Sequence, residues 1–363
     1  MNILVDIGHP AHVHLYRHFI NEIKKKGAKV TITVRDIPAA KTLLDIYGLN
    51  YIELGRKRDT LFGKLADQIN YDFQVLKIVR QKGINIGVGS SIVLPHVSAV
   101  THVPSIVLDD DDDEVEPLFR YFAHPFATTL LSPDVLRNKR GRKGTLYYPG
   151  YHELAYLHPS VFTPDEDVPV SAGIKPGDRY FILRFNAFRA HHDQGVQGLT
   201  VEQKLRLIER LKPEGRIFIS AERDIGIEFE EYRLSVSPEK IHSLINYATL
   251  LIGDSQTMSS EAAVLGTPSL RMNSFAGRIS YLEEEEKRYG LTYAFKPDEF
   301  DGMLARLDYL LTLPNLKQEW QQRRSRMLAE KINVTAFIVW FVENYPGSIK
   351  TMEKESWNIL QFR

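Results

Sequence analysis

Short apolar runs alternate with stretches of helical periodicity along this chain, and this alternation constrains the fold more than any other feature of the sequence. The first apolar run, Ile3–Ile7, is followed by apolar residues at helical spacing, which are Val13, Phe19, Ile20 and Ile23. Gly27 then follows three lysines, which predicts the end of a helix, and Val30–Val34 predicts a second strand. Such a strand–helix–strand unit is the repeating element of a parallel sheet.

The alternation continues and divides the chain into two halves. It lapses between Pro149 and Asp178, where prolines mark a connection, and it resumes with an apolar run at Tyr180–Phe185. We therefore expect an α/β protein with two doubly wound parallel-sheet domains, residues 1–165 and 170–330. Residues 331–363 are expected to form a helical tail that packs back on the body.

Composition narrows the range of functions. The chain has 46 Lys plus Arg against 46 Asp plus Glu, so no net field attracts it to nucleic acid. It contains no cysteine, which excludes disulfides and thiolate chemistry. The N-terminal residues do not have the pattern of a signal peptide, and no apolar run approaches the ~20 residues needed to span a bilayer. The sequence predicts a cytoplasmic protein without a transmembrane segment, and it leaves the oligomeric state open.

The segment Leu250–Ser269 is the most informative one for function. An apolar strand leads into the polar loop Gly253–Gln256, which opens a predicted helix. The N–H groups and the dipole at a helix N-terminus make a site for an anion. Ser255 and Thr257 can add hydroxyl donors to a diphosphate, and the Glu261 carboxylate can accept hydrogen bonds from two ribose hydroxyls.

An alternative interpretation gives this segment a structural role alone, in which Asp254 or Ser255 caps the helix and Glu261 is solvated. We expect instead that the segment holds a nucleotide. The residues expected to contact it are Gly253, Asp254, Ser255, Gln256, Thr257, Met258 and Glu261.

Residues 254–268, Asp-Ser-Gln-Thr-Met-Ser-Ser-Glu-Ala-Ala-Val-Leu-Gly-Thr-Pro, resemble the nucleotide-binding loop and helix of GT-B glycosyltransferases. They are most similar to the non-hydrolysing UDP-N-acetylglucosamine 2-epimerases. On that pattern Ser255 matches the diphosphate-contacting serine and Glu261 the ribose-binding glutamate, whereas Gln256 and Thr257 replace paired glycines.

The whole chain also resembles an uncharacterised prokaryotic family of the same superfamily. The resemblance rests on the opening Asp-Ile-Gly-His-Pro-Ala-His-Val-His, on Leu-Arg-Phe…Ala-His-His-Asp, and on residues 254–268. It implies a GT-B-like fold of two facing Rossmann-like domains, of which the second binds a nucleotide-sugar, expected to be a UDP-sugar.

The segment Gly8–His14 follows the first predicted strand, where GT-B enzymes carry a Gly-His pair that faces the cleft. We expect Gly8 to contact substrate, and His9, with His12 as second choice, to accept a proton from a sugar hydroxyl. The alternative is that one histidine caps the helix. His14 and His18 are expected on the helix surface, and no carboxylate in the segment has the spacing for a metal site.

A second polar loop follows the first strand of the second half. Arg184 is expected to bind a diphosphate bidentately, and Asn186 to contact the substrate. His192 with Asp193 is expected to contact the donor sugar or take part in the chemistry. The alternative is a loop that its own hydrogen bonds stabilise. Glu222, after the next strand, is a weaker candidate for the same site.

Five consecutive aspartates, Asp109–Asp113, follow a predicted strand. Their oxygens suit Mg²⁺, but we expect a solvated loop or the acidic start of a helix, with Asp109 or Glu114 facing the cleft. The basic segment Arg137–Lys143 is expected to be a solvated loop, with contact to anionic lipid or a polyanionic acceptor as the alternative.

These expectations combine into a nucleotide-sugar-dependent glycosyltransferase of GT-B type that acts in glycan or polysaccharide biosynthesis. It would use a UDP-sugar donor and a glycan or lipid-linked acceptor, without a permanently bound cofactor or metal, and peripheral membrane contact is compatible with it. The alternatives are a UDP-N-acetylhexosamine 2-epimerase and a non-catalytic nucleotide-sugar-binding protein.

Overall fold

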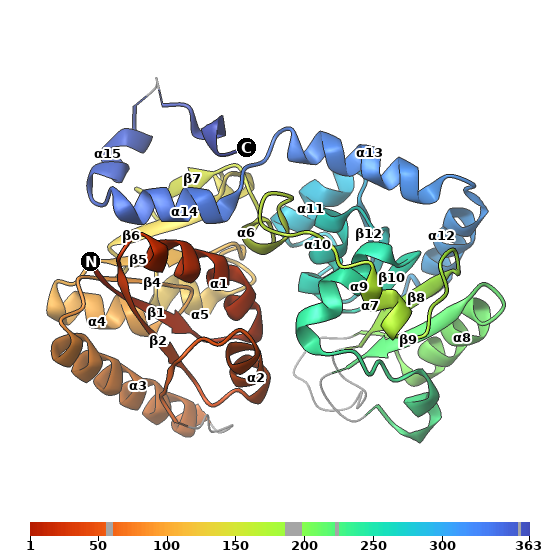
Figure 1. Ribbon diagram of the computed structural model, residues 1–363, viewed down its shortest axis with the longest axis horizontal. Coiled ribbons are helices and arrows are strands. Elements are labelled where there is room, and N and C mark those ends of the chain that lie inside the picture. Colours follow the sequence, from red (N-terminus) through yellow and green to blue (C-terminus); the bar gives the residue numbers. More distant parts are fainter. Residues whose placement is uncertain (56–60, 186–197, 222–224, 355–356) are drawn as a thin grey trace. The chain divides into compact units, whose positions relative to one another are not determined.

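The computed structural model describes the chain except residues 56–60, 186–197, 222–224 and 355–356, and it divides into two compact units (Figure 1). Unit 1 consists of Met1–Tyr156 together with Lys331–Arg363, and unit 2 is Leu157–Glu330. The division falls within the proline-rich stretch that follows Pro149.

Unit 1 is built on a parallel sheet with the strand order β3-β2-β1-β4-β5-β6-β7. The strands are β1 (Asn2–Ile7), β2 (Lys29–Val34), β3 (Ile52–Glu53), β4 (Ile86–Gly89), β5 (Ser105–Leu108), β6 (Thr129–Pro133) and β7 (Leu146–Tyr148). The order reverses at β1, because β2 and β3 extend to one side and β4 to β7 to the other. The loops after β1 and β4 therefore flank the switch point, where doubly wound sheets bind their ligands.

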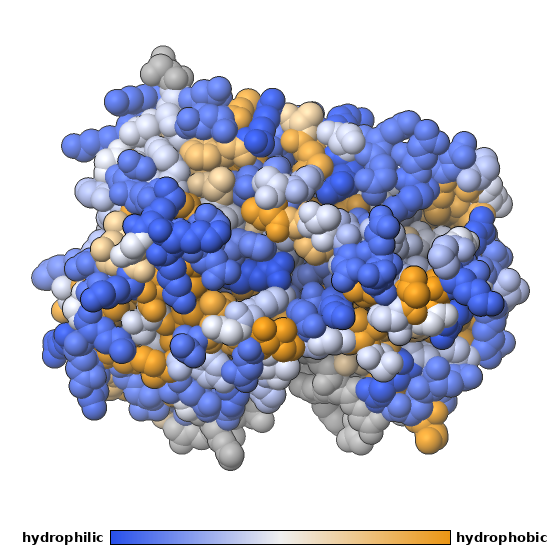
Figure 2. Space-filling view, viewed as in Figure 1, coloured by the Kyte–Doolittle hydropathy of each residue, from blue (hydrophilic) through white to orange (hydrophobic). Residues whose placement is uncertain are grey.

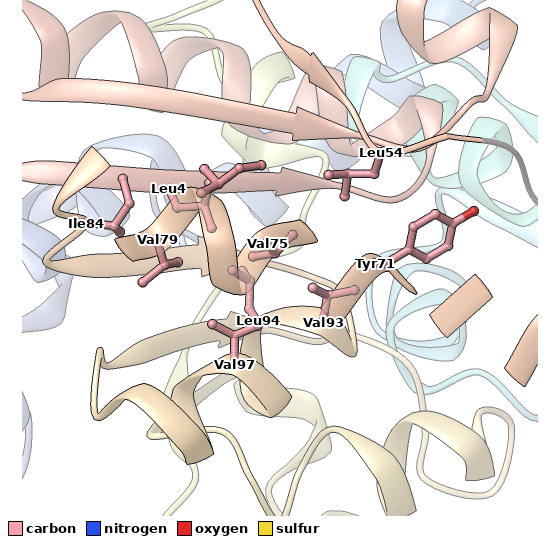
Figure 3. Close-up of a cluster of buried hydrophobic side chains, with 10 residues drawn as sticks. Leu4, Leu54, Tyr71, Val75, Val79, Ile84, Val93, Leu94 and Val97 are labelled. Atoms are coloured by element: carbon pink, nitrogen blue, oxygen red, sulfur yellow. The ribbon is translucent and has the colours of Figure 1, made fainter. Parts of the chain in front are cut away.

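Helices surround this sheet and cover its core. They are α1 (Pro10–Lys25), α2 (Pro38–Ile46), α3 (Leu61–Lys82), α4 (Val93–Thr101), α5 (Pro117–Phe122), α6 (Leu154–Leu157, which runs one residue into unit 2), α14 (Val334–Glu343) and α15 (Gly347–Met352). One buried cluster joins Leu4 of β1 to Val75 and Val79 of α3 and to Leu94 and Val97 of α4 (Figure 3). The alternating apolar runs of the sequence thus meet as strand and helix faces in one core.

Helix α1 shows how the sequence sets the ends of an element. Nδ1 of His9 accepts a hydrogen bond from the Ala11 N–H, so His9 caps the helix, and Pro10 occupies its first position. Lys24 and Lys25 lie in the last turn, where cations complement the helix dipole. Gly27 follows with φ 88°, a left-handed conformation that glycine adopts without strain.

The C-terminal residues pack back on unit 1, as the sequence predicts. Helix α14 contacts α1, and the Thr335 hydroxyl donates to the Ala155 carbonyl at 2.6 Å. The indole rings of Trp340 and Trp357 stack at 4.8 Å, which ties the last residues to α14.

Unit 2 has a parallel sheet with the strand order β12-β11-β10-β8-β9. The strands are β8 (Tyr180–Arg184), β9 (Arg216–Ser220), β10 (Leu250–Gly253), β11 (Ser269–Met272) and β12 (Thr292–Phe295). The helices are α7 (Asp167–Ser171), α8 (Val201–Leu211), α9 (Ile241–Tyr247), α10 (Gln256–Leu265), α11 (Ser280–Lys287), α12 (Phe300–Thr312) and α13 (Leu316–Leu328). The order reverses between β8 and β10, so this unit also has a switch point.

The structure contains elements that the sequence pattern does not predict. Strands β7 and β12 lie at edges of the two sheets, and each is short and has a single buried residue, Tyr148 in β7 and Thr292 in β12. The charged stretch Pro297–Glu330 contains two helices, α12 and α13. Pro314 separates them, because proline disfavours the helical conformation at Leu313, which is extended.

Candidate functional site

The switch point of unit 2 brings the ends of β8 and β10 side by side. Arg184 and Gly253 are paired across the two strands, and the Asp254 N–H donates to the Arg184 carbonyl at 3.1 Å. A Cβ atom at position 253 would lie 1.9 Å from that carbonyl oxygen, so only glycine fits there. This close approach fixes the start of the loop that carries the predicted nucleotide-binding residues.

Helix α10 begins directly after this loop. Ser255 caps it, with Oγ accepting from the Met258 N–H at 3.3 Å, and Gly266 ends it with φ 71°. Gln256 and Thr257, the first two helical residues, are half-buried. Their N–H groups have no partner inside the helix, and the positive end of the dipole lies at this terminus. The arrangement is one that binds anions in other proteins.

Two cationic side chains lie at the same switch point. Nη1 of the buried Arg184 donates to the Ser220 hydroxyl at 3.3 Å, which places the guanidinium across the ends of β8 and β9. Lys204 of α8 is fully buried, with Nζ 4.9 Å from the centroid of the Phe185 ring. Burial lowers the pKa of Lys204, and the Asp254 carboxylate opposes this shift. Lys204 was not predicted as a site residue, because a lysine in a helix is ordinarily solvated.

The carboxylate of Glu261 is buried rather than solvated. Its Oε1 accepts a hydrogen bond from Nε2 of His242 in α9 at 2.9 Å, and both side chains are buried. The Phe162 ring meets the His242 imidazole edge-on at 6.2 Å between centroids. The solvated carboxylate of the alternative interpretation is therefore not observed, and the position of Glu261 is set by a histidine that the sequence analysis missed.

A polar network braces the same loop from β11. Nδ2 of Asn273 donates to the Asp254 carbonyl at 2.9 Å, and Nη1 of the fully buried Arg271 donates to Asn273 Oδ1 at 3.0 Å. Burial lowers the pKa of Arg271, and Tyr281 and nearby glutamates oppose the shift. The loop before α10 is thus held by bonds to neighbouring strands on both sides.

Four of the predicted site residues lie outside the described residues. They are Asn186, His192, Asp193 and Glu222.

At the switch point of unit 1, His9 and His12 both use Nδ1 as an acceptor. Nδ1 of His9 accepts from the Ala11 N–H at 3.2 Å, and Nδ1 of His12 accepts from the Gly8 N–H at 3.3 Å. A neutral imidazole that accepts at Nδ1 carries its proton on Nε2. Both rings therefore present a donor at Nε2 rather than the lone pair that a general base needs.

Electrostatics keep His12 in this neutral form. Burial of the ring, together with the neighbouring imidazoles of His9 and His152, lowers the pKa of His12 to about 3, and the Asp110 carboxylate opposes this shift. His14, which the sequence predicts on the helix surface, is instead buried. Its ring stacks on Tyr156 at 5.5 Å because α1 presents that face to the core.

A histidine–aspartate pair lies close to His12. Nδ1 of His152 donates to Oδ2 of Asp110 at 3.0 Å. Nε2 of His152 is buried and has no hydrogen-bond partner among the described residues. A carboxylate that binds Nδ1–H leaves the lone pair on Nε2 free to accept a proton. The sequence analysis missed His152, which lies 42 residues after Asp110 and in no recognisable motif.

The acidic run is not the solvated loop or helix start that the sequence predicts. Asp109 is buried and binds Nε2 of His124 at 2.7 Å and Nη1 of Arg140 at 2.9 Å. Asp113 is buried and binds Nη1 of Arg140 at 2.7 Å and the Gly141 N–H at 2.8 Å. Glu114 is exposed. These carboxylates can be buried because cations from the basic segment neutralise them.

That basic segment is correspondingly not a purely solvated loop. The Arg140 side chain is 1% exposed, and Lys139 lies 3.3 Å from Oδ1 of Asp112. Two carboxylates can be buried with one arginine because the attraction between the guanidinium and each carboxylate offsets the loss of hydration. The two charge runs of the sequence are therefore partners.

Asp109, Asp110 and Asp111 offer oxygens that lie within 4.8 Å of one another, as a metal site requires. Two of these carboxylates already bind cationic or N–H donors, from Arg140, His124 and His152. The donor set is thus engaged in ion pairs, and no metal is assigned to it.

Comparison with known proteins identifies a family match and a relative of this chain. Residues 1–277 match the model of a family described as "Protein of unknown function (DUF354)". Uncharacterized protein MJ0665 of Methanocaldococcus jannaschii is 21% identical over 300 residues, which are 79% of this chain and 86% of that protein.

Solved structures show the fold. UDP-GlcNAc 2-epimerase from Neisseria meningitidis, bound to UDP-GlcNAc, is 10% identical with a TM-score of 0.66, over 94% of this chain and 98% of that chain. The glycosyltransferase SsfS6 of Streptomyces sp. SF2575, complexed with thymidine diphosphate, is 12% identical with a TM-score of 0.62, over 95% and 99%. The predicted GT-B-like fold of two Rossmann-like domains is thereby confirmed.

Proposed function

Because the chain belongs to the DUF354 family of proteins of unknown function, we propose its activity from its own sites: it is a nucleotide-sugar-dependent glycosyltransferase of GT-B type. The observation that carries the proposal is the switch point of unit 2, where β8, which ends at Arg184, pairs with β10, which leads into the N-terminus of α10. The expected donor is a UDP-sugar, and the expected setting is glycan or polysaccharide biosynthesis.

In this proposal unit 2 holds the leaving group. The diphosphate binds the N–H groups of Gln256 and Thr257 and the cations Arg184 and Lys204, while Glu261 accepts from the ribose hydroxyls. Negative charge grows on the diphosphate as the glycosidic bond breaks, and fixed donors stabilise it there. His192, Asp193, Asn186 and Glu222 remain candidates for contacts to the donor.

Unit 1 offers a candidate base. We propose that Nε2 of His152 takes the proton of an acceptor hydroxyl. Asp110 orients His152 and stabilises the imidazolium that forms. His9 and His12, predicted as bases, are reassigned as neutral donors to sugar oxygens, since Nδ1 of each is already an acceptor.

A second candidate function, a UDP-N-acetylhexosamine 2-epimerase, is favoured by one observation. Burial and the neighbouring Asp110 and Asp109 carboxylates hold the pKa of Asp111 well above its ordinary value. Burial acts to raise the pKa of Asp110, but the charge and hydrogen bond of His152, a backbone hydrogen bond and Arg140 together lower it. Two carboxyl groups with separated pKa values suit an acid and a base, which elimination and readdition of UDP require.

Incubation of the purified chain with UDP-sugars distinguishes these functions. Release of UDP only when a glycan or lipid-linked acceptor is present supports transfer. A new UDP-sugar isomer, with solvent deuterium at C2, identifies the epimerase instead. Saturable binding without turnover of any donor identifies a nucleotide-sugar-binding protein and refutes both enzymes.

A further inference from the structure

Several of the large apolar side chains that unit 1 exposes lie on neighbouring elements. They lie on α3, α4, α5 and the turn after α5, and we call this set the apolar face: Ile69, Phe73, Val100, Leu118, Tyr121, Phe122 and Phe126. The exposed fractions run from 46% for Phe126 to 66% for Phe73. Figure 2 shows hydrophobic side chains gathered over the side of unit 1 that α3 and α4 form in Figure 1.

His96 of α4 joins these elements into one surface. Its Nδ1 binds Oδ2 of Asp72 on α3 at 2.8 Å, and its Nε2 donates to the Phe122 carbonyl at 2.9 Å. The His96 ring also meets the Phe126 ring edge-on at 5.6 Å between centroids. Residues of α3, α4 and α5 are therefore neighbours around His96.

The exposed side chains are additional to the core. On α3, Tyr71 and Val75 point into the buried cluster, whereas Ile69 and Phe73 share the opposite face one turn apart. On α5, Phe119 packs against the core while Leu118 and Phe122 are exposed. A contiguous exposed patch of this kind, on a folded domain, marks an interaction surface.

Cations border the apolar face on two sides. Lys77 and Arg80 continue the exposed side of α3 beyond Phe73 at helical spacing, and both are exposed. On the other side, Arg142 donates to the carbonyl of Ala127, next to Phe126. Lys143 is exposed beside it. The segment 137–143 thus ends against the apolar face.

We propose that the apolar face docks this protein on the surface of an anionic lipid bilayer. Aromatic and aliphatic side chains enter the boundary between headgroups and acyl chains, and the bordering lysines and arginines bind anionic headgroups. Among the described residues no helix has the length and apolar character to cross a membrane. Docking does not depend on the activity proposed above.

The cationic residues that border the apolar face favour docking on an anionic bilayer over dimerisation with a second copy of the chain. A two-fold dimer through the apolar face would bring each cationic border close to the same border of its partner. Like charges oppose that contact, whereas an anionic surface attracts both borders at once.

Co-sedimentation of the full chain with vesicles tests the proposal. Binding to mixed phosphatidylcholine–phosphatidylglycerol vesicles is expected, with weak binding to phosphatidylcholine alone and a loss at high salt. Phe73→Asp and Phe122→Asp should each lower the partition coefficient more than about tenfold. Lys143→Glu should lower it several-fold, because one cation contributes a factor of about five.

Matched controls keep the test specific. Ile227→Asp changes the most exposed apolar side chain of unit 2, at 90% exposure, and Lys175→Glu reverses an exposed charge there; neither should alter vesicle binding. Circular dichroism confirms that each variant is folded.

Unchanged binding of both Phe variants overturns the proposal, as does absence of binding to every vesicle. Self-association that Phe122→Asp abolishes, without vesicle binding, overturns it in favour of a dimer. Calorimetry with UDP tests the nucleotide site separately.

Discussion

The Glu261 carboxylate accepts a hydrogen bond from Nε2 of His242 at 2.9 Å, and both side chains are buried in unit 2. This contact fixes the orientation of the carboxylate that is proposed to hold the ribose. The proposed nucleotide site therefore depends on α9 as well as on α10, although only α10 carries the sequence motif.

Substituting either member of this pair should weaken nucleotide binding. Glu261→Gln and His242→Ala are each expected to cost about 1–3 kcal/mol of UDP binding, the usual effect of losing a partner of a charged hydrogen bond. The double variant should cost less than the sum, because the two groups act together. Calorimetry measures the affinities, with Glu209→Gln on the exposed side of α8 as the control. Unchanged affinity in both single variants would refute the ribose assignment.

Removing the proposed base should affect turnover and not binding. His152→Gln is expected to lower kcat by about 10²–10⁴-fold, the typical contribution of a general base, with UDP affinity unchanged. His9→Ala should lower it less, because that ring is proposed as a donor. His102→Asn, an exposed histidine of unit 1 with φ 60°, serves as the control. Full activity of His152→Gln would show that His152 is not the general base.

Arg140 should be essential for the stability of unit 1. Arg140→Met leaves the buried carboxylates of Asp109 and Asp113 without their shared cation, which is expected to cost about 3–5 kcal/mol. Urea unfolding measures the loss. Arg137→Met, an exposed residue of the same segment, should change stability by less than about 0.5 kcal/mol. Equal effects of the two substitutions would contradict the buried ion-pair network.

Gly253 should not tolerate a side chain. Gly253→Ala places a Cβ 1.9 Å from the Arg184 carbonyl oxygen, so β8 and β10 must separate, at an expected cost of about 1–3 kcal/mol. Gly302→Ala is the matched control, because its Cβ meets nothing within 4 Å and it lies in helix α12. That substitution should be neutral or stabilise by up to about 1 kcal/mol. Thermal unfolding of both variants provides the comparison.

His12 should make unit 1 less stable in acid. Its pKa is about 3 in the folded protein against 6.5 ordinarily, so between these values the unfolded chain binds the extra proton. Stability is complete above pH 6.5 and falls as the pH decreases towards 3, by roughly 1–2 kcal/mol at pH 5. His12→Asn keeps an acceptor for the Gly8 N–H and should reduce this loss. Denaturant unfolding at pH 7 and pH 5 shows whether the two proteins differ.

The alternation of apolar runs and helical stretches determined the parallel sheets, the two halves and the order of most elements, because these follow from local periodicity and turn residues. The motif from Gly253 to Glu261 likewise predicted the loop and capped helix at the end of β10. Edge strands β7 and β12 were not predictable, since each is short and has one buried residue, which is too few to show a pattern.

Only the tertiary structure decided which side chains act together. The acidic and basic runs looked like two solvated loops in sequence, yet Arg140 lies between Asp109 and Asp113. Residues 242 and 261 met through the packing of two helices, and residues 110 and 152 through the ends of neighbouring elements. Periodicity indicates which face of a helix or strand is buried, but it does not indicate which other element packs against that face. A contact between polar groups far apart in sequence is set by packing, and with it whether a charge is solvated, paired or free to move a proton.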